Sequence, residues 1–341
     1  MKKLKTKAFL WIVLAFALLA LPVHGSNVMA EETGTGYAVT VNNGTLQCTY
    51  NGVQQKQVYL ALTAVDNVYT VVLPQTEGSK IYYFNADGVG KAYTGTKIIA
   101  ITYGDKETEY YVKKGVLGTG WYKSGSKRYY YTDGKMATGW KKIGSYRYYF
   151  SKESSNKGVL LTNQIAGTKS DGYYYVDGSG IQVTSKEIKL AVKFVNAHTK
   201  TSWSKDKKLK ECFKYLWKNY TYKRFYETPK ASKLSGYATY MLSNKKGNCY
   251  RYACSFACIA KVLGYETRVA VGQISSARGG MTPHGWTEVK VGGKWYMCDA
   301  NMQRNHPSIN SYMKTNGSYA YRHSCSKRFK LTIKKGKVSW K

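Results

Sequence analysis

A short aromatic pattern repeats in the middle of the chain and limits that region to stacked β-hairpins. Gly-Trp-Tyr-Lys at residues 120–123 recurs nineteen residues later as Gly-Trp-Lys-Lys at 139–142, and the Tyr-Tyr-Tyr-Thr-Asp-Gly of 129–134 is echoed at 173–178. Each unit predicts an aromatic strand, an Asp-Gly turn and a strand that closes on Gly-Trp. One such hairpin cannot bury its own aromatic face, so neighbouring hairpins must stack over residues 111–184.

These repeats resemble the aromatic cell-wall-binding repeats of Gram-positive surface proteins, the choline-binding and glucan-binding modules. In that family, aromatic side chains of successive hairpins enclose a choline cation or form platforms for sugar rings. The resemblance implies that Trp121, Trp140, Tyr130, Tyr149 and Tyr174 bind a wall ligand, although tyrosine stands at many positions where the family has tryptophan. The alternative is that these side chains form only the core of the repeats, the commoner role of an aromatic stripe.

The start of the chain has the pattern of a secretory signal peptide. Four lysines precede an apolar run over residues 8–23, and Val-Met-Ala at 28–30 offers compact side chains before a cleavage point. We expect residues 1–30 to be removed and the mature chain to contain no membrane span. Residues 31–110, rich in Tyr, Val, Thr and Gly, predict short strands and turns, including a degenerate repeat at 82–88. The protein is therefore expected to be secreted or held at the cell surface.

The charge of the mature chain is strongly positive. The sequence has 53 Lys and Arg against 19 Asp and Glu, and removal of four signal-peptide lysines leaves a formal charge near +30. Such a chain attracts polyanions without distinguishing among nucleic acid, anionic lipid and an anionic wall. Export disfavours nucleic acid, and the sequence has no helix-turn-helix, zinc-finger or RNA-binding signature. We expect the partner to be an anionic or carbohydrate cell-wall polymer.

After Thr184 the apolar period changes from two to that of a helix, which predicts a further domain over 185–341. Thr-Ser-Lys-Glu at 184–187 has the pattern of a capping box, and Ser204 is a candidate cap for a second helix. Beyond Gly264 the period returns to two, with a Gly-Gly turn at 292–293. Helices followed by an antiparallel sheet predict an α+β domain. The whole chain is then multidomain, with an all-β N-terminal region, a hairpin-repeat solenoid and an α+β domain.

One cysteine stands at the predicted start of a helix. Gly-Asn at 247–248 is a turn signal, and apolar side chains from Tyr252 to Leu263 follow at helical spacing. Cys249 therefore lies in the first helical turn, where unpaired N–H groups and the helix dipole favour a thiolate nucleophile.

A base and its orienting group are predicted on a neighbouring hairpin. His284 opens one strand and Asp299 closes the next, and the Gly-Gly turn between these strands brings the two residues together. If this sheet packs on the helix that begins at Cys249, the imidazole lies between thiol and carboxylate, as nucleophilic catalysis requires. Taken singly, Cys249 could be a buried thiol, His284 a core histidine and Asp299 a turn cap.

Seven cysteines leave at least one unpaired if the others form disulfides, and Cys249 is the candidate. The alternative is that several of the others are small buried apolar residues. The spacing of Cys249, Cys254 and Cys258 lacks the paired pattern of a zinc site, so no metal is expected.

The segments around these three residues resemble the transglutaminase-like superfamily, whose core is papain-like. They are Gly-Asn-Cys-Tyr-Arg-Tyr-Ala at 247–253, Leu-Gly-Tyr-Glu-Thr-Arg-Val at 263–269, His-Gly-Trp-Thr-Glu-Val at 284–289 and Trp-Tyr-Met-Cys-Asp at 295–299. The resemblance covers about residues 185–341 and keeps the family's order. It implies that Cys249 is the nucleophile, His284 the base and Asp299 its orienting group.

These observations predict an exported cysteine acyl-transfer enzyme held at the cell wall by its repeats. Through a Cys249 thioester it would hydrolyse a peptide or amide, or transfer the acyl group to an amine, with no cofactor. The loops 222–244 and 275–283 are expected to select the protein or peptide substrate. The alternative is an inactive wall-binding or adhesive protein that uses the transglutaminase-like domain as a binding scaffold.

Overall fold

The computed structural model describes residues 28–29, 36–42, 45–65, 68–71, 80–103 and 105–341. Apart from Val28–Met29, the predicted signal peptide lies outside this range. No helix within the described residues is long and apolar enough to cross a membrane. The chain divides into two compact units, one of residues 1–119 and 133–135 and the other of residues 120–132 and 136–341.

The first unit is all-β in its described residues. Its antiparallel sheet has the order β1-β2-β3-β8-β7-β11-β10-β9, with β4 on β3 and β5 pairing with β6 and β7. Because successive side chains of a strand face opposite ways, Leu60 and Leu62 enter one core cluster and Ala61 enters another. The strands are β1 (Val28–Met29), β2 (Tyr37–Asn42), β3 (Thr45–Tyr50), β4 (Val53–Gln54), β5 (Val58–Val65), β6 (Val68–Val71), β7 (Lys80–Phe84), β8 (Val89–Ala92), β9 (Thr96–Tyr103), β10 (Lys106–Lys113) and β11 (Val116–Leu117).

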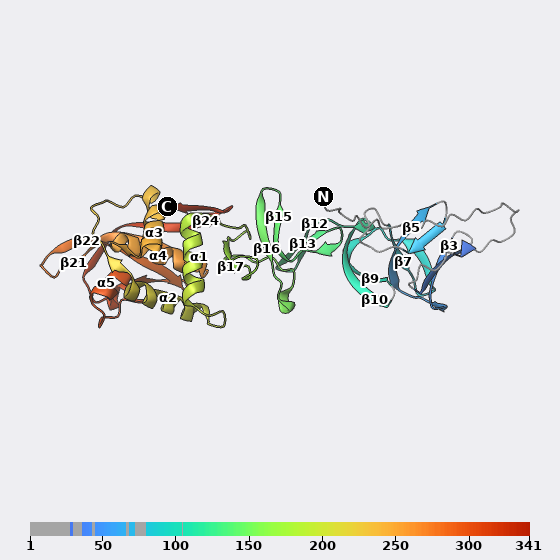
Figure 1. Cartoon of the computed structure of the whole chain (residues 1–341), viewed down its shortest axis with the longest axis horizontal. Coiled ribbons are helices and arrows are strands. Elements are labelled where there is room, and N and C mark those ends of the chain that lie inside the picture. Colours follow the sequence, from blue (N-terminus) through green and yellow to red (C-terminus); the bar gives the residue numbers. More distant parts are fainter. Residues whose placement is uncertain (1–27, 30–35, 43–44, 66–67, 72–79, 104) are drawn as a thin grey trace, which may run out of the picture. The chain divides into compact units, whose positions relative to one another are not determined.

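The second unit begins with the aromatic repeats, which form short hairpins (Figure 1). The predicted aromatic strand and Asp-Gly turn are present between residues 127–132 and 135–136, but each Gly-Trp lies in a separate strand that pairs with the aromatic strand after it. The reason is the turn: Gly125 and Gly144 take positive φ angles of 56° and 58° and each starts a two-residue connection. The elements are β12 (Gly120–Ser124), β13 (Lys127–Thr132), β14 (Lys135–Met136), β15 (Gly139–Ile143), β16 (Tyr146–Phe150), η1 (Ser154–Asn156), β17 (Gln164–Ala166) and β18 (Tyr174–Val176).

The rest of the second unit is an α+β domain, which confirms the predicted fold class. Its antiparallel sheet has the order β23-β22-β21-β24-β25. The helices are α1 (Lys186–His198), α2 (Lys205–Asn219), α3 (Ala231–Asn244), α4 (Cys249–Val262) and α5 (Ala300–Asn305), with a 3-10 turn η2 (Asn316–Ser318). The strands are β19 (Thr221–Tyr222), β20 (Lys246–Gly247), β21 (Glu266–Ser275), β22 (Met281–Val291), β23 (Lys294–Cys298), β24 (His323–Lys334) and β25 (Lys337–Trp340).

Helix α4 is the centre of this domain (Figure 1). It contacts β21 and β22 of the sheet as well as α1, α2 and α3, and all but one of its fourteen residues are buried. A helix that is apolar on every face belongs in a core. It ends before Gly264, whose φ of 84° is the left-handed conformation that terminates helices.

Two local predictions are corrected by the structure. The cap of α1 is Ser185 rather than Thr184, and its side chain makes no capping bond. Glu187, expected to complete a capping box, instead accepts a 2.9 Å hydrogen bond from Ser235 of α3. By contrast, Ser204 caps α2 and accepts from the N–H of Lys207 at 3.2 Å. The α1 cap failed because a tertiary partner competes for the carboxylate.

The last repeat is joined to the α+β domain. Tyr175 and Val183 are buried in the same core cluster as α1, α2 and α4. Asp177 is 1% exposed; its Oδ1 accepts from the N–H groups of Ser179 and Ile181, and its Oδ2 accepts from the N–H of Gly336, in the β24–β25 turn, at 2.9 Å. Residues that flank position 184 therefore share one core.

Candidate active site

Cys249 is the first residue of α4, and the chain before it is shaped to present it. Asn248 is the N-cap, and its side-chain oxygen accepts from the N–H of Arg251 at 3.2 Å. A Cβ on Gly247 would lie 2.7 Å from both the Cβ of Arg251 and the sulfur of Met241. Only glycine allows this close turn into the helix.

Strand β22 packs closely on the start of α4. A Cβ on Gly285 would lie 2.6 Å from the ring of Tyr250, so the neighbour of His284 must be glycine for the strand to approach. Thr287 donates to the carbonyl of Ala253 at 2.8 Å and fastens β22 to the helix. These contacts hold His284 in place relative to Cys249.

The structure brings His284 and Asp299 together. His284 Nε2 and Asp299 Oδ2 are 2.7 Å apart, and the two side chains are 5% and 1% exposed. Asp299 follows β23 and is the N-cap of α5, where its Oδ1 accepts from the N–H of Met302 at 3.0 Å. The contact uses Nε2 of the imidazole and leaves Nδ1 for another partner, and Cys249 lines the same cleft as His284. Cys249, His284 and Asp299 thus form one connected group.

A fourth residue, Tyr319, completes this group and was not identified from the sequence. Its hydroxyl donates to Asp299 Oδ2 at 2.7 Å. Tyr319 follows η2, twenty residues beyond Asp299, and no sequence pattern links the two. The buried carboxylate therefore has donors on both of its oxygens, as a buried charge requires.

The electrostatics of the pair favour an ionised carboxylate and a protonated imidazole. Burial lowers the pKa of His284, but the charges of Asp299 and Cys249 and hydrogen bonds to both outweigh it and raise the pKa to about 10. Burial raises the pKa of Asp299, but the charge of His284 and its hydrogen bonds hold that pKa below its ordinary value. At neutral pH a protonated imidazole therefore lies beside the cysteine.

A loop before α3 is anchored to the start of α4. Arg251 forms an ion pair with Glu227, and its guanidinium carbon lies 3.6 Å from the centroid of the Phe225 ring. Asn248 Nδ2 also donates to Glu227, at 3.3 Å. Because β19 pairs with β20, Tyr222 lies beside Gly247, two residues before the cysteine. The loop therefore begins at the candidate site.

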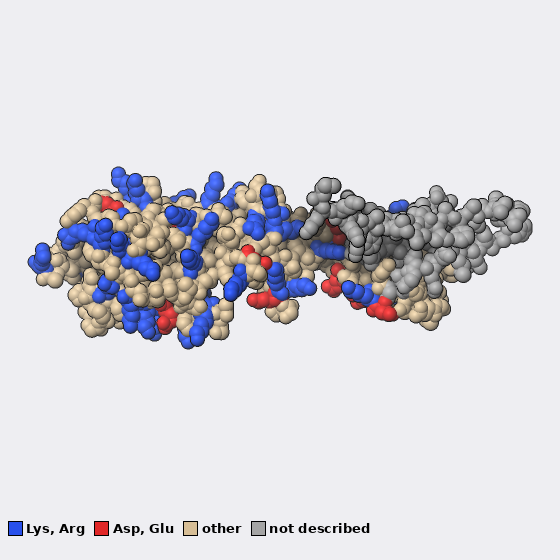
Figure 2. All heavy atoms as spheres, in the orientation of Figure 1, with Lys and Arg blue, Asp and Glu red and all other residues tan. Residues whose placement is uncertain are grey.

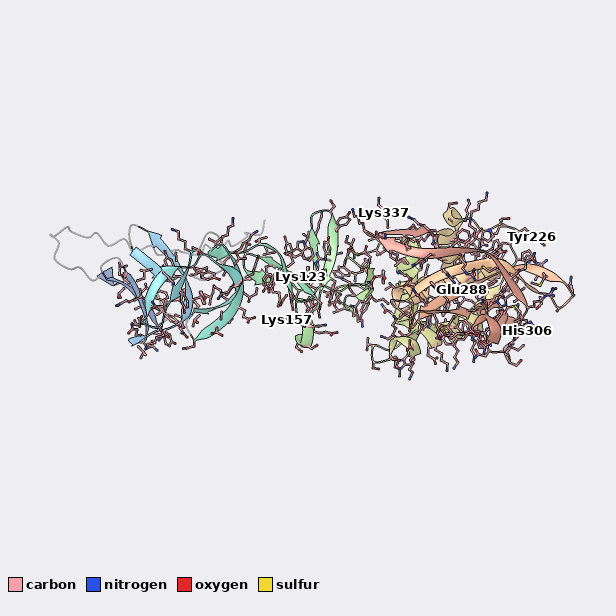
Figure 3. All side chains as sticks on the ribbon, turned by 180° about the vertical axis from the view of Figure 1, so that it is seen from behind. Lys123, Lys157, Tyr226, Glu288, His306 and Lys337 are labelled. Atoms are coloured by element: carbon pink, nitrogen blue, oxygen red, sulfur yellow. The ribbon has the colours of Figure 1, made fainter. Side chains whose placement is uncertain are left out.

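A cleft of about 660 Å³ opens over Cys249 and His284. Both loops expected to select the substrate contribute to it, with Tyr222 and Arg224 from one and residues 275–278 from the other. His306 also lines it, and Figure 3 shows His306 and Tyr226 at the same end of the domain.

One buried amide on the cleft wall lacks a partner. Asn301 is 3% exposed, and its Nδ2 has no hydrogen-bond partner within the described residues. An unsatisfied buried donor costs about 1–3 kcal/mol.

The other cysteines differ from Cys249 in environment. All seven are free, and of these only Cys249 lines the cleft. Burial raises the pKa of Cys212 and that of Cys298 to about 12, so these side chains remain thiols. Cys212 and Cys298 are therefore small buried residues, which is the alternative to disulfide formation considered from the sequence.

Two charged residues of the domain are buried. Arg251 is 7% exposed and Glu288 is 4% exposed. Glu288 pairs with Arg268 of β21 and with Arg328 of β24, 3.0 Å away. Both partners of Glu288 lie on the same side of β22, because β21 is its neighbour in the sheet and β24 is the next strand beyond β21.

In the repeats, Trp121 lies in an open aromatic group and Trp140 in a closed one. Trp121 meets Tyr130 at 5.4 Å and Tyr148 at 5.2 Å between ring centroids, both nearly perpendicular. Trp140 meets Tyr149 at 5.0 Å and Tyr174 at 5.6 Å. Tyr149 is 3% exposed and belongs to a core cluster, whereas Trp121 is 36% exposed.

An arginine side chain of the protein lies over the ring of each of these tryptophans. The guanidinium carbon of Arg128 lies 4.4 Å from the centroid of the Trp121 ring, and that of Arg147 lies 5.3 Å from that of Trp140. Cation–π attraction of this kind is what an aromatic cage offers to an external cation. The chain's own cations therefore occupy faces of both rings.

The fold and the site define an α+β domain with a Cys-His-Asp group, preceded by aromatic hairpin repeats. Residues 189–300 match the family model "Transglutaminase-like superfamily". Residues 75–89 and 138–154 match the model "Putative cell wall binding repeat". The chain thus contains a transglutaminase-like core together with cell wall repeats of the choline-binding type.

Several solved structures are similar to parts of the chain. CbpJ of Streptococcus pneumoniae is 22% identical over 44% of this chain and 67% of its own, with a TM-score of 0.24. The choline-binding domain of Spr1274 from the same organism is 33% identical over 20% of this chain and 77% of its own, with a TM-score of 0.18. A "Putative Cysteine Protease" from Cytophaga hutchinsonii is 13% identical over 46% and 59%, with a TM-score of 0.29. No curated protein matches the chain.

Proposed function

We propose that this protein is a cysteine acyl-transfer enzyme of the cell surface, with Cys249 as nucleophile, His284 as acid and base, and Asp299 as the group that orients the imidazole. The observation that carries the proposal is the 2.7 Å contact between His284 and Asp299 in a cleft that also contains the thiol of Cys249. Nucleophile, base and orienting group in hydrogen-bonded series are the requirement for thiol catalysis.

The acylation step follows from this arrangement. The Cys249 thiolate attacks the carbonyl carbon of an amide, and the oxyanion is stabilised by N–H groups of the first turn of α4, which have no partner within the helix. The C–N bond then breaks as the His284 imidazolium gives its proton to the leaving amine. The products are a Cys249 thioester, a neutral imidazole and a free amine.

The second step returns the enzyme to its starting state. Neutral His284 takes a proton from water or from an acceptor amine, which attacks the thioester and releases the acyl group as an acid or as a new amide. Asp299 stabilises the imidazolium that re-forms. We favour hydrolysis over amine transfer, because no described residue marks an amine-acceptor site.

Replacement of Cys249 tests the mechanism. Cys249→Ala should abolish turnover of peptide and wall-fragment amides while circular dichroism shows the fold unchanged. Alkylation by iodoacetamide, mapped by peptide mass spectrometry, should disappear at Cys249 and persist at the partly exposed Cys325. Turnover retained in this variant would rule out the mechanism, and absence of turnover in the wild type would favour a binding scaffold.

We further propose that the repeats hold the enzyme at the wall through anionic groups of a wall polymer. A guanidinium stacked on an indole keeps its N–H edge free for an anion. Arg128 on Trp121 and Arg147 on Trp140 both have this arrangement. Lysine and arginine side chains also cover much of the visible face of the second unit (Figure 2).

Wall binding by the intact protein distinguishes anion binding from choline binding. Adsorption to isolated walls should weaken with added NaCl, since salt screens exposed charges. Arg128→Gln combined with Arg147→Gln should weaken it, whereas Lys210→Gln on α2 should not. Elution by choline chloride, at a concentration where NaCl has no effect, would show that the aromatic rings bind choline instead.

A further inference from the structure

The catalytic cleft has a one-sided charge. Arg224, Arg278 and His306 line it, and none of its described lining residues is an aspartate or a glutamate. Arg224 and Arg278 come from two different loops that line the cleft, one before Cys249 and one after it in the sequence. An excess of positive charge in a cleft raises the local concentration of anions.

The basic residues of the cleft differ in kind from those of the rest of the chain. Only nine of the 53 basic residues are arginines, yet both charged bases in the cleft are arginine and no lysine lines it. If the cleft only reflected the basic composition of the whole chain, its charged residues would be mostly lysines. Arginine offers a planar pair of donors that matches a carboxylate, which a lysine does not.

These two arginines are also free of carboxylate partners. Arg251 pairs with Glu227, and Arg268 and Arg328 pair with Glu288. Within the described residues, neither Arg224 nor Arg278 forms an ion pair. Arg224 lies 5.9 Å from the ring centroid of Tyr226, an aromatic side chain that is 90% exposed.

The buried amide of Asn301 is a second, independent sign of a ligand. Among the described parts of the chain its Nδ2 has no partner, although the residue is almost fully buried on the cleft wall. A neutral amide donor and two guanidinium donors in one cleft suit a ligand that is rich in oxygen acceptors.

We propose that the acyl donor is an acidic peptide with a carboxylate beside the scissile amide. Arg224 and Arg278 bind this carboxylate, and Asn301 donates to an oxygen atom of the peptide. This rests on the proposed function, since it names the substrate of the same site. The two arginines set specificity, and Cys249 and His284 carry out the chemistry.

The test compares two matched peptide amides that differ only by Glu or Gln beside the scissile bond. With the intact protein, kcat/KM should be about 5- to 10-fold higher for the Glu peptide at low salt, the range expected for an arginine–carboxylate pair at a partly open site. Arg224→Gln and Arg278→Gln should each reduce that ratio, because each lowers kcat/KM for the Glu peptide more than kcat/KM for the Gln peptide. Lys210→Gln, which removes the same charge away from the cleft, should preserve the ratio.

A binding measurement separates this proposal from the proposed function. In Cys249→Ala, which cannot turn over, calorimetry or NMR titration should show tighter binding of the Glu peptide, and Asn301→Ala should weaken binding of both peptides. Turnover without preference for the Glu peptide would overturn the acidic-donor proposal and leave the enzyme intact. Preferential binding without thioester formation at Cys249 in the wild type would support the acidic ligand and overturn the catalytic role.

Discussion

The hydroxyl of Tyr319 donates a 2.7 Å hydrogen bond to Asp299 Oδ2, the oxygen that His284 contacts at the same distance. Asp299 Oδ2 thus accepts a hydrogen bond from the phenol of Tyr319 and also contacts the imidazole of His284. Tyr319→Phe should destabilise the fold by about 1.5–3 kcal/mol, the range for a hydrogen bond to a charged group. Turnover should fall about 3- to 10-fold, because a less firmly held carboxylate orients His284 less well.

Chemical denaturation and a pH–rate profile check this prediction together. Loss of the phenol removes a bond that favours the charged carboxylate, so the acid limb of the profile should move to higher pH. Tyr296→Phe on β23 is the matched control, with little change expected in either measurement. An unchanged acid limb in Tyr319→Phe would contradict a role in positioning Asp299.

The ion pair of His284 with Asp299 makes stability depend on pH in a defined direction. The folded pKa of His284, about 10, lies above its ordinary value of 6.5, so its contribution is fully present below pH 6.5. That contribution is lost as pH rises toward 10. The pKa of Asp299 is lowered, so its contribution is present above its ordinary 3.8 and is lost as pH falls through the lowered value.

Free energies of unfolding of the wild type and of His284→Gln, measured from pH 5 to pH 10, give the test. The difference between the two proteins should be largest near pH 6 and shrink steadily above it. A difference that grows with pH would mean that the folded protein holds His284 neutral.

Gly285 is expected to be essential for the approach of β22 to α4. Gly285→Ala places a methyl group 2.6 Å from the Tyr250 ring and should cost about 1–3 kcal/mol, as overpacking does. Activity should fall more than stability suggests, since a small displacement of His284 from Cys249 is enough to slow the reaction. Gly236→Ala on α3, where a Cβ meets nothing, should instead stabilise the protein by about 1 kcal/mol. Equal effects of the two substitutions on activity would contradict this account.

Glu227 is expected to fix the loop that carries Arg224. Glu227→Gln leaves the mostly buried guanidinium of Arg251 without its counter-charge and should destabilise the domain by about 2–4 kcal/mol. Limited proteolysis should then cut residues 223–230 faster than in the wild type. Glu266→Gln removes an exposed carboxylate that pairs with Lys290 and Lys330, and its effect should stay within about 1 kcal/mol.

The elements that follow from periodicity were predictable from the sequence. The apolar spacing of α4, the stop at Gly264 and the two-glycine turn between β22 and β23 are local signals, and together they bring His284 beside Asp299. Each depends on residues within a few positions of one another.

What could not be predicted depends on contacts between distant segments. Tyr319 reaches Asp299 through a turn, and Arg224 reaches the cleft because a two-residue strand, β19, pairs with the residues before Cys249. Glu187 was wrongly predicted to complete a capping box, because its carboxylate accepts a hydrogen bond from Ser235, 48 residues away. No local pattern encodes such pairs, since tertiary packing decides them.

The bond from Gly336 to Asp177 affects how such chains can diversify. One hydrogen bond joins the turn of the last repeat to the turn of the final hairpin of the α+β domain, and Tyr175 and Val183 lie in the core of that domain. Shuffling of genes at residue 184 would therefore separate parts that fold together. Exchange of the aromatic repeats between such chains should therefore succeed only where the terminal repeat stays with the α+β domain.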